Sequence, residues 1–172
     1  TIPDRTAVVY KDKKYTYKEL DEISDRLGKY IVSLGIGRED VVSILIPRCE
    51  YMAIAPMGVI KAGAAYQPLD STYPKDRLMY MLEDSSAKLL IADRELLSLV
   101  DGYNGPVLFT DEILSLDDTG AELGRPDVHD LFILLYTSGS TGVPKGCMLE
   151  YGNITSFCHW YRKYYSIDSD SK

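Results

Sequence analysis

The sequence has 172 residues, of which 45% are hydrophobic, so it can bury one full core and is close to the common length of a single domain. Its formal net charge is −7 and no cluster of Lys or Arg offsets it, so DNA and RNA are not expected partners. No apolar run approaches the ~18 residues that span a bilayer and no targeting signal opens the chain, so we expect a soluble, cytoplasmic protein that does not bind a membrane.

The first predicted helix follows Thr16, which forms a capping box with Glu19. Apolar residues then recur with helical spacing until Gly35, where the helix is expected to end. These residues are Leu20, Ile23, Leu27, Tyr30, Ile31 and Leu34. The next run, from Val41 to Ile46, is almost wholly apolar and predicts a strand that is buried on both faces.

Helices and strands continue to alternate along the chain. The predicted helices are 50–62, 74–85 and the shorter 94–100, and the predicted strands are 88–93, 107–111 and 131–136. Between residues 111 and 130 the apolar density falls, which predicts a surface loop. Asn153 is expected to cap a last helix, whose apolar face includes Phe157, Cys158 and Tyr161.

Alternating strands and helices predict an α/β fold with a mostly parallel sheet, and ligands of such folds bind beyond the carboxyl ends of the strands. The segment YTSGSTGVPKG, Tyr136 to Gly146, follows the most apolar predicted strand. Glycines and small hydroxyl residues leave backbone N–H groups free to converge on phosphate oxygens. The spacing fits neither the Walker A motif nor the Rossmann motif, and the extended MLEY that follows predicts a strand, loop, strand arrangement.

Ser/Thr/Gly clusters between strands are more often plain turns, so composition alone leaves phosphate binding and a solvated turn both open. The segment AGAAYQPLD, residues 62–70, is interpreted as structural, because its small residues allow a helix end to pack closely on a strand. We interpret HWYRKYY, residues 159–165, as part of an amphipathic helix that packs on one side, not as a stacking platform.

The three cysteines, Cys49, Cys147 and Cys158, are far apart and form no C-x-x-C pair. Only His129 and His159 could supplement them as metal ligands, so no protein metal site is expected. We interpret all three as reduced thiols and expect each to be a small buried hydrophobic residue.

Three motifs resemble those of the AMP-forming adenylating enzymes, a superfamily that includes acyl-CoA synthetases, luciferases and the adenylation domains of nonribosomal peptide synthetases. The motif LLYTSGSTGVPKG resembles the superfamily signature. YTYKEL (Tyr15 to Leu20) and IKAGAAYQPLDSTYPKDRL (Ile60 to Leu78) resemble the first two core motifs of the peptide synthetase branch. The resemblance covers essentially the whole chain, so residues 1–172 are expected to form the N-terminal part of an AMP-binding adenylation domain, with a layered α-β-α sheet from its large subdomain.

The resemblance implies an AMP-forming ligase that uses ATP and Mg²⁺. An amino-acid carboxylate attacks the α-phosphate, pyrophosphate leaves, and the aminoacyl group then passes to the phosphopantetheine thiol of a carrier domain. The β and γ phosphates would be held by the signature loop, and the residues implied are Thr137, Ser138, Gly139, Ser140, Thr141, Gly142 and Lys145.

The chain ends before the family's amino-acid pocket, adenine-binding segment, ribose-binding Asp, hinge and catalytic Lys, so it is expected to contain no catalytic residue and to be inactive alone. Cys147 and Tyr151 stand where the family commonly has Val and His, and Gln67 occupies a position that is usually apolar. A D-alanine or acyl-CoA ligase, or a noncatalytic scaffold with the same fold, remains the alternative.

Overall fold

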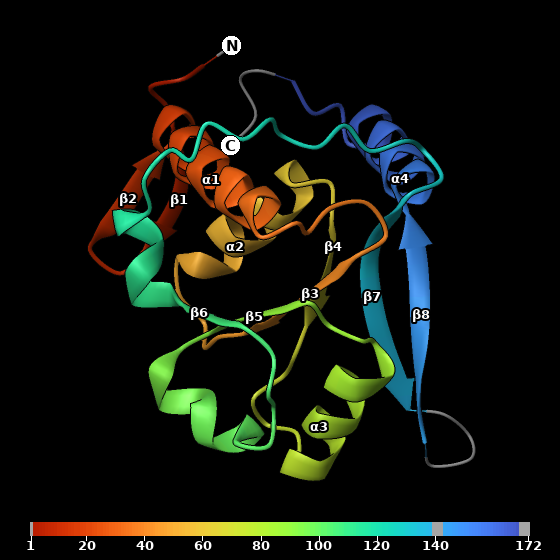
Figure 1. The fold of residues 1–172 in the computed structure, drawn as a ribbon. Helices are drawn as coiled ribbons and strands as arrows, with labels where there is room; N and C mark the ends of the chain where they lie inside the picture. Colours follow the sequence, from red (N-terminus) through yellow and green to blue (C-terminus); the bar gives the residue numbers. More distant parts are fainter. Residues whose placement is uncertain (1, 139–142, 169–172) are drawn as a thin grey trace.

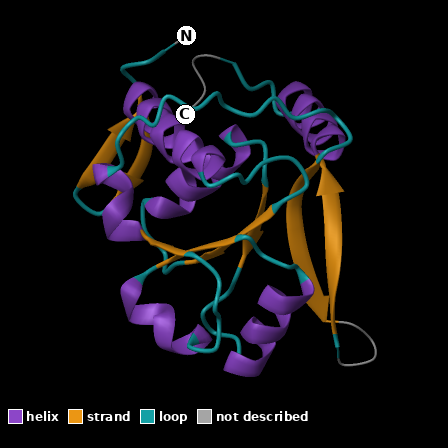
Figure 2. Cartoon of the chain, viewed as in Figure 1, coloured by secondary structure: helices purple, strands orange, loops and turns teal. Residues whose placement is uncertain are grey.

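A six-stranded sheet forms the centre of the computed structural model, which describes residues 2–138 and 143–168 (Figures 1 and 2). Its strands are β3 (Val41–Leu45), β4 (Ala65–Pro68), β5 (Leu89–Ala92), β6 (Val107–Phe109), β7 (Leu131–Ser138) and β8 (Pro144–Glu150). They lie in the order β6-β5-β3-β4-β7-β8, and every neighbouring pair is parallel except β7 and β8. The mostly parallel sheet is thus confirmed, and so are the two strands on either side of residues 139–142, which lie outside the described residues.

Helices cover both faces of this sheet (Figure 1). The helices are α1 (Tyr17–Ser33), α2 (Tyr51–Lys61), α3 (Lys75–Asp84) and α4 (Tyr151–Tyr164), and the 3-10 helices are η1 (Arg94–Val100) and η2 (Thr110–Ser115). The paired helices α1 and α2 lie on one face, and α3 and η1 lie on the other. This is the expected α-β-α layering.

Strand β3 is buried on both faces, as its apolar run predicted. Val42 and Ile44 belong to the core beneath α1 and α2, whereas Leu45 belongs to the core beneath α3 and η1. Successive side chains of a strand point to opposite faces, so a strand between two helical layers must be apolar at nearly every position.

Helix α1 begins as its capping box predicted. The Glu19 N–H donates to Oγ1 of Thr16 at 3.2 Å, and the Thr16 N–H donates to Oε2 of Glu19 at 2.8 Å. Gly35, with a φ of +78°, ends the helical region in the left-handed conformation that glycine adopts without strain. Before α1, β1 (Thr6–Tyr10) and β2 (Lys13–Thr16) form a separate antiparallel pair for which no strand was predicted.

Several boundaries differ from the sequence prediction. The strand predicted at 107–111 ends at Phe109, because the chain turns into η2 there, so the predicted loop begins after that helix. Asn153 is not the N-cap of α4. It lies inside the first turn and its Oδ1 accepts from the N–H of Glu150, the actual N-cap residue, at 2.9 Å.

The predicted burial of the cysteines and of the last helix is wrong. Cys49 is half-buried, and Cys147 and Cys158 are exposed, because they lie on the edge strand β8 and on α4. No α4 side chain is buried by the part of the chain that the structure describes. Its aromatic rings contact one another instead, and Trp160 and Tyr164 stack with centroids 5.2 Å apart.

Across residues 2–138 and 143–168, none of the helices is both long enough and apolar enough to cross a bilayer.

Candidate functional site

The carboxyl ends of β3, β4 and β7 meet at one edge of the sheet and border a pocket of about 620 Å³. Residues just after β3 and β4 and at the end of β7 form much of its wall. They are Ile46, Pro47 and Arg48, then Leu69 to Tyr73, then Leu135 and Tyr136. This is the edge at which parallel α/β sheets bind ligands, and the volume suits a small molecule.

The hairpin of β7 and β8 brings three of the predicted phosphate-binding residues to this edge. Thr137 is the cross-strand partner of Lys145, and Ser138 is the partner of Pro144. The side chains of Thr137, Ser138 and Lys145 are all exposed. The Thr137 hydroxyl and the Lys145 ammonium group therefore lie on one face of the hairpin, and the Ser138 hydroxyl lies on the other, and each is able to donate to an anion. The remaining predicted residues, Gly139, Ser140, Thr141 and Gly142, lie outside the described residues.

Tyr136 links this hairpin to helix α3. Its hydroxyl donates to Oδ2 of Asp84 at 2.6 Å, and Asp84 is the last residue of α3. Burial raises the pKa of Tyr136, and the hydrogen bond to the Asp84 carboxylate raises it further by a smaller amount. The phenol therefore stays protonated at neutral pH. The ring faces Gly146 on β8, where an added Cβ would lie 3.4 Å from Cζ of Tyr136.

The pocket wall also contains charged residues that the sequence analysis did not identify. Arg48 is exposed and lies shortly after β3, and Asp70 lies shortly after β4. Oδ1 of Asp70 accepts from the N–H and the hydroxyl of Thr72 at 2.9 and 2.8 Å. These bonds, and the positive charge of Arg48, lower the pKa of Asp70. Both residues could have been identified in the sequence because they lie shortly after predicted parallel strands.

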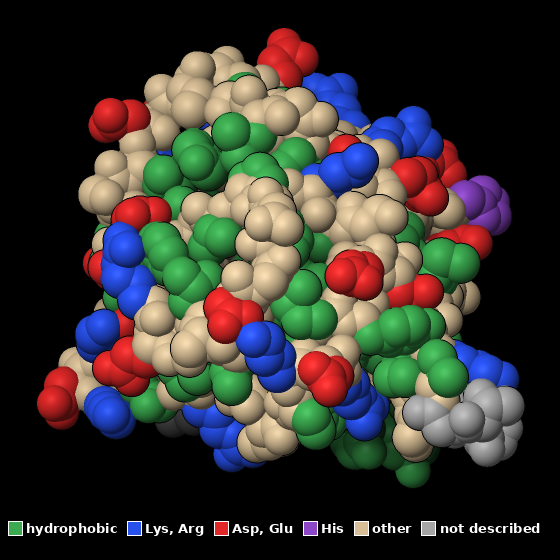
Figure 3. Space-filling view, turned by 60° about the horizontal axis from the view of Figure 1, so that its bottom comes forward, with side chains coloured by type: hydrophobic (Ala, Val, Ile, Leu, Met, Phe, Trp, Pro, Cys, Tyr) green, Lys and Arg blue, Asp and Glu red, His purple; other side chains and the backbone are tan. Residues whose placement is uncertain are grey.

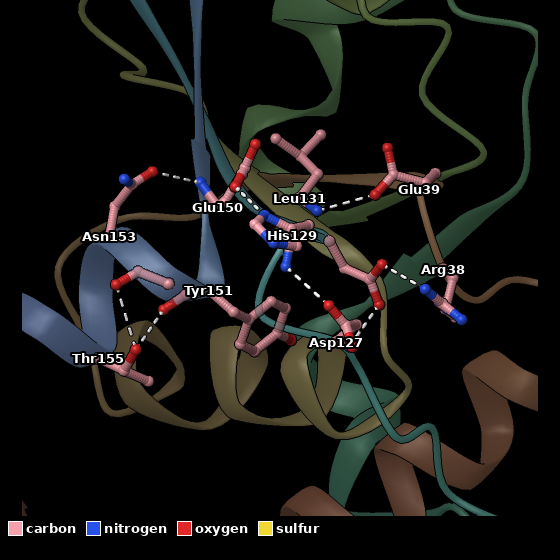
Figure 4. A network of polar contacts seen from close by, with 11 residues as sticks. Arg38, Glu39, Asp127, His129, Leu131, Glu150, Tyr151, Asn153 and Thr155 are labelled. Atoms are coloured by element: carbon pink, nitrogen blue, oxygen red, sulfur yellow. Dashed lines mark hydrogen bonds and ion pairs between the residues drawn. The ribbon is translucent and has the colours of Figure 1, made fainter.

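A second polar network fixes the opposite end of the hairpin (Figure 4). Nη2 of Arg38 donates to Oδ1 of Asp130 at 2.6 Å, and the Asp127 N–H donates to Oδ2 of the same carboxylate at 2.6 Å. The Arg38 hydrogen bond holds the pKa of Asp130 below its usual value. Oε1 of Glu39 accepts from the Leu131 N–H at 2.8 Å, which anchors the first residue of β7. Arg38 and Glu39, which come before β3, thus hold the base of the hairpin, where β7 begins and β8 ends.

Tyr151 lies at this base and not beside the signature loop. It begins α4, at the far end of β8 from Lys145. Its hydroxyl donates to the carbonyl oxygen of Ile60 at 3.2 Å, and its ring packs edge-on against Phe132. Burial and, to a smaller extent, the negative charge of Asp130 raise the pKa of Tyr151 to about 12. Tyr151 therefore joins α4 to α2.

No group of three or more His, Cys, Asp or Glu side chains in the described ranges could hold a metal ion. On the face seen in Figure 3, Lys and Arg side chains are interspersed with Asp and Glu and do not gather into a basic patch.

A model of the family described as AMP-binding enzyme matches residues 1–171. One of the linear gramicidin synthase proteins of Brevibacillus parabrevis is 37% identical over 172 residues, which are 99% of this chain and 2% of that protein. Surfactin synthase subunit 2 of Bacillus subtilis strain 168 is 38% identical over 98% of this chain and 5% of its own length. The chain therefore spans a small part of the length of these relatives.

The fold also matches solved structures. The o-succinylbenzoate coenzyme A synthetase MenE of Bacillus subtilis, in complex with ATP and a magnesium ion, superposes with a TM-score of 0.83 at 22% identity. The match covers 97% of this chain and 45% of that chain. At this identity the likeness is one of fold, and it agrees with the layered α/β architecture of the described residues.

Proposed function

Because the chain belongs to the AMP-binding enzyme family, we propose that residues 1–172 are the N-terminal part of an amino-acid-activating adenylation domain. In the reaction proposed for the whole domain, an amino-acid carboxylate attacks the α-phosphate of ATP and forms an O–P bond. The bond between the α- and β-phosphates breaks to release pyrophosphate and leaves an aminoacyl adenylate. A phosphopantetheine thiol on a carrier domain then attacks the acyl carbon, so that the aminoacyl group forms a thioester and AMP leaves. This chain contributes the part of the domain that holds the phosphates.

The observation that carries the proposal is the pairing of Thr137 with Lys145, one position along β7 from Tyr136, which lines the pocket. A protonated lysine and neighbouring hydroxyl groups suit the β and γ phosphates, because hydrogen bonds to a charged group are stronger than those between neutral groups. Lys145, Thr137 and Ser138 donate from the described residues. Gly139 to Gly142 complete the proposed loop.

ATP would bring Mg²⁺ with it. Mg²⁺ keeps several waters and commonly binds through substrate phosphates and one or two carboxylates, so a dedicated cluster of protein ligands is not required. When bound, the ion neutralises phosphate charge as pyrophosphate leaves. The chain's own contribution is to position the phosphates, and Arg48 adds a second exposed positive charge on the pocket wall.

The sequence identities to the related proteins favour amino-acid activation over acyl-CoA formation. The gramicidin and surfactin synthase proteins are 37% and 38% identical, whereas the coenzyme A synthetase is 22% identical. The amino-acid substrate and the carrier domain are part of the same proposal. So is a cytoplasmic location, which suits three free thiols and a reaction that consumes ATP.

Replacing Lys145 with Ala in the full protein tests the phosphate site. The variant should lose about tenfold or more in kcat/KM for ATP, because a charge-assisted contact contributes roughly 1.5–3 kcal/mol. The activity is ATP–pyrophosphate exchange, first screened over the common amino acids to find one that the wild type activates.

The matched control is Lys14→Ala, which removes an exposed lysine from β2, in the separate two-stranded sheet. Its ATP kinetics should equal those of the wild type. Unchanged kinetics in a folded Lys145→Ala variant would make Lys145 a solvated surface residue. Absence of both exchange and MgATP binding in the wild type would support the noncatalytic scaffold instead.

A further inference from the structure

The distal half of the β7–β8 hairpin extends beyond the support of the parallel sheet. Strand β7 pairs with β4 at Ile133 and Tyr66, but its pairing with β8 continues to Ser138 and Pro144. Past Ile133 and Leu134 the β7 residues are exposed or only half-buried, and every β8 residue from Lys145 to Met148 is exposed. The segment that presents Thr137, Ser138 and Lys145 therefore has little apolar core of its own.

Tyr136 makes the contact that joins this segment to the rest of the molecule. Its ring packs against the core beneath α3, and its hydroxyl reaches Oδ2 of Asp84 at 2.6 Å. On the other strand the ring lies against Gly146, where an added Cβ would be in van der Waals contact with Cζ of Tyr136 at 3.4 Å. One side chain thus contacts both strands of the hairpin and the last residue of helix α3.

The position of Tyr136 also separates this contact from the ligand-facing groups. Side chains alternate along a strand, so Thr137 and its partner Lys145 point to the face opposite that of Tyr136. The phenol can hold the hairpin from one side without occupying the place where Thr137 and Lys145 donate.

We propose that Tyr136 and Asp84 are a positioning pair that fixes the distal half of the β7–β8 hairpin against helix α3, an inference that rests on the proposed function for its effect on ATP. The hydrogen bond between a phenol and a carboxylate is charge-assisted, and it is strong relative to one between neutral groups. The pair sets the distance between the pocket wall and the hydroxyl and ammonium groups of the hairpin end. Neither residue contacts the phosphates in this proposal.

Tyr136→Phe removes the hydroxyl and keeps the ring. The matched control is Tyr80→Phe, because Tyr80 also donates to Asp84, at 3.4 Å to Oδ1, but lies on α3 itself. Each substitution thus removes a hydroxyl that donates to the Asp84 carboxylate, but only Tyr136 belongs to the hairpin. Asp84→Ala removes the acceptor, and the double variant Tyr136→Phe/Asp84→Ala tests whether the two residues act as one unit.

The first measurement is amide hydrogen exchange in the full protein without nucleotide, read from peptides that cover Pro144 to Glu150. Tyr136→Phe should speed exchange there about fivefold or more, the effect expected of one hydrogen bond, while peptides from β3 stay unchanged. Asp84→Ala should do the same, the double variant should add little, and Tyr80→Phe should match the wild type. Unchanged exchange in Tyr136→Phe overturns the pair, whether or not the protein binds ATP.

The second measurement is the dissociation constant of MgATP by calorimetry, at a temperature where all variants are folded. Tyr136→Phe and Asp84→Ala should each weaken binding about threefold to tenfold. Faster exchange with an unchanged dissociation constant overturns the positioning role and leaves a local stabilising contact. A wild type that binds no MgATP contradicts the proposed function, and the exchange data still decide whether the pair anchors the hairpin.

Discussion

The amide group of Gln67 is completely buried. Its Oε1 accepts from the Ser43 hydroxyl at 2.5 Å, and its Nε2 donates to the carbonyl oxygen of Met81 at 3.1 Å. The side chain therefore joins β3, β4 and α3, and its partner Met81 lines the pocket. A buried polar group of this kind is tolerated because its hydrogen bonds are satisfied.

Gln67→Leu should lower the free energy of unfolding of the chain by about 1–3 kcal/mol, because the buried Ser43 hydroxyl loses its acceptor. The measurement is urea unfolding followed by circular dichroism. In the double variant Ser43→Ala/Gln67→Leu both polar partners are gone, so part of the lost stability should return. A double variant that is less stable than Gln67→Leu would mean that packing, not hydrogen bonding, determines the effect.

At the scale of elements, α4 differs from the other three helices because its aromatic face is uncovered by the described residues. Phe157, Trp160 and Tyr164 are 55%, 53% and 67% exposed. The sequence pattern predicted the helix correctly, since periodicity shows which residues share a face. It could not show whether another element covers that face, because burial depends on residues far away in the chain.

Tyr164→Ser should change the free energy of unfolding by less than about 0.5 kcal/mol, as expected of an exposed position. Leu90→Ala is the control, because Leu90 is fully buried in β5 and should cost about 2–5 kcal/mol. Both are measured by urea unfolding of the same chain. A loss above about 1 kcal/mol in Tyr164→Ser would show that the aromatic cluster stabilises α4 substantially.

The prediction of the other elements succeeded where local rules and burial agree. The Thr16 and Glu19 capping box defined the start of α1, and the apolar run from Val41 predicted a strand buried on both faces. The phosphate-binding role of the candidate site stays a prediction. Thr137 and Lys145 were recognised from the motif, but Arg48 and Tyr136 enter the site through strand order and helix packing, which no local pattern encodes.

Considered as a whole molecule, the chain is joined by contacts between residues far apart in sequence. Arg38 and Asp130, and likewise Glu39 and Leu131, are 92 positions apart, and Tyr151 contacts Ile60 from 91 positions away. These contacts attach β7, β8 and α4 to the earlier βα units. The pocket is lined by residues of the earlier βα units and by residues of β7, so it forms only when β7 is attached to those units.

The isolated 172-residue chain should not catalyse ATP–pyrophosphate exchange with any common amino acid. It spans 45% of the coenzyme A synthetase chain that it matches, and orientation of two bound substrates supplies much of the barrier lowering in such reactions. The measurement is radiolabelled exchange with the purified chain, with the full protein as the positive control. Robust exchange by the chain alone would show that it contains a complete substrate site.

The sheet order also determines how long one strand edge stays open during synthesis. Strand β4 and its neighbour β7 are separated by about sixty residues along the chain. A ribosome adds about 5–20 residues per second, so Pro68 is made roughly 3–12 s before Leu131. Through this interval one edge of β4 has unpaired N–H and C=O groups, which invite pairing with other nascent chains. Slow codons between these two strands would lengthen that exposure, and fast codons would shorten it.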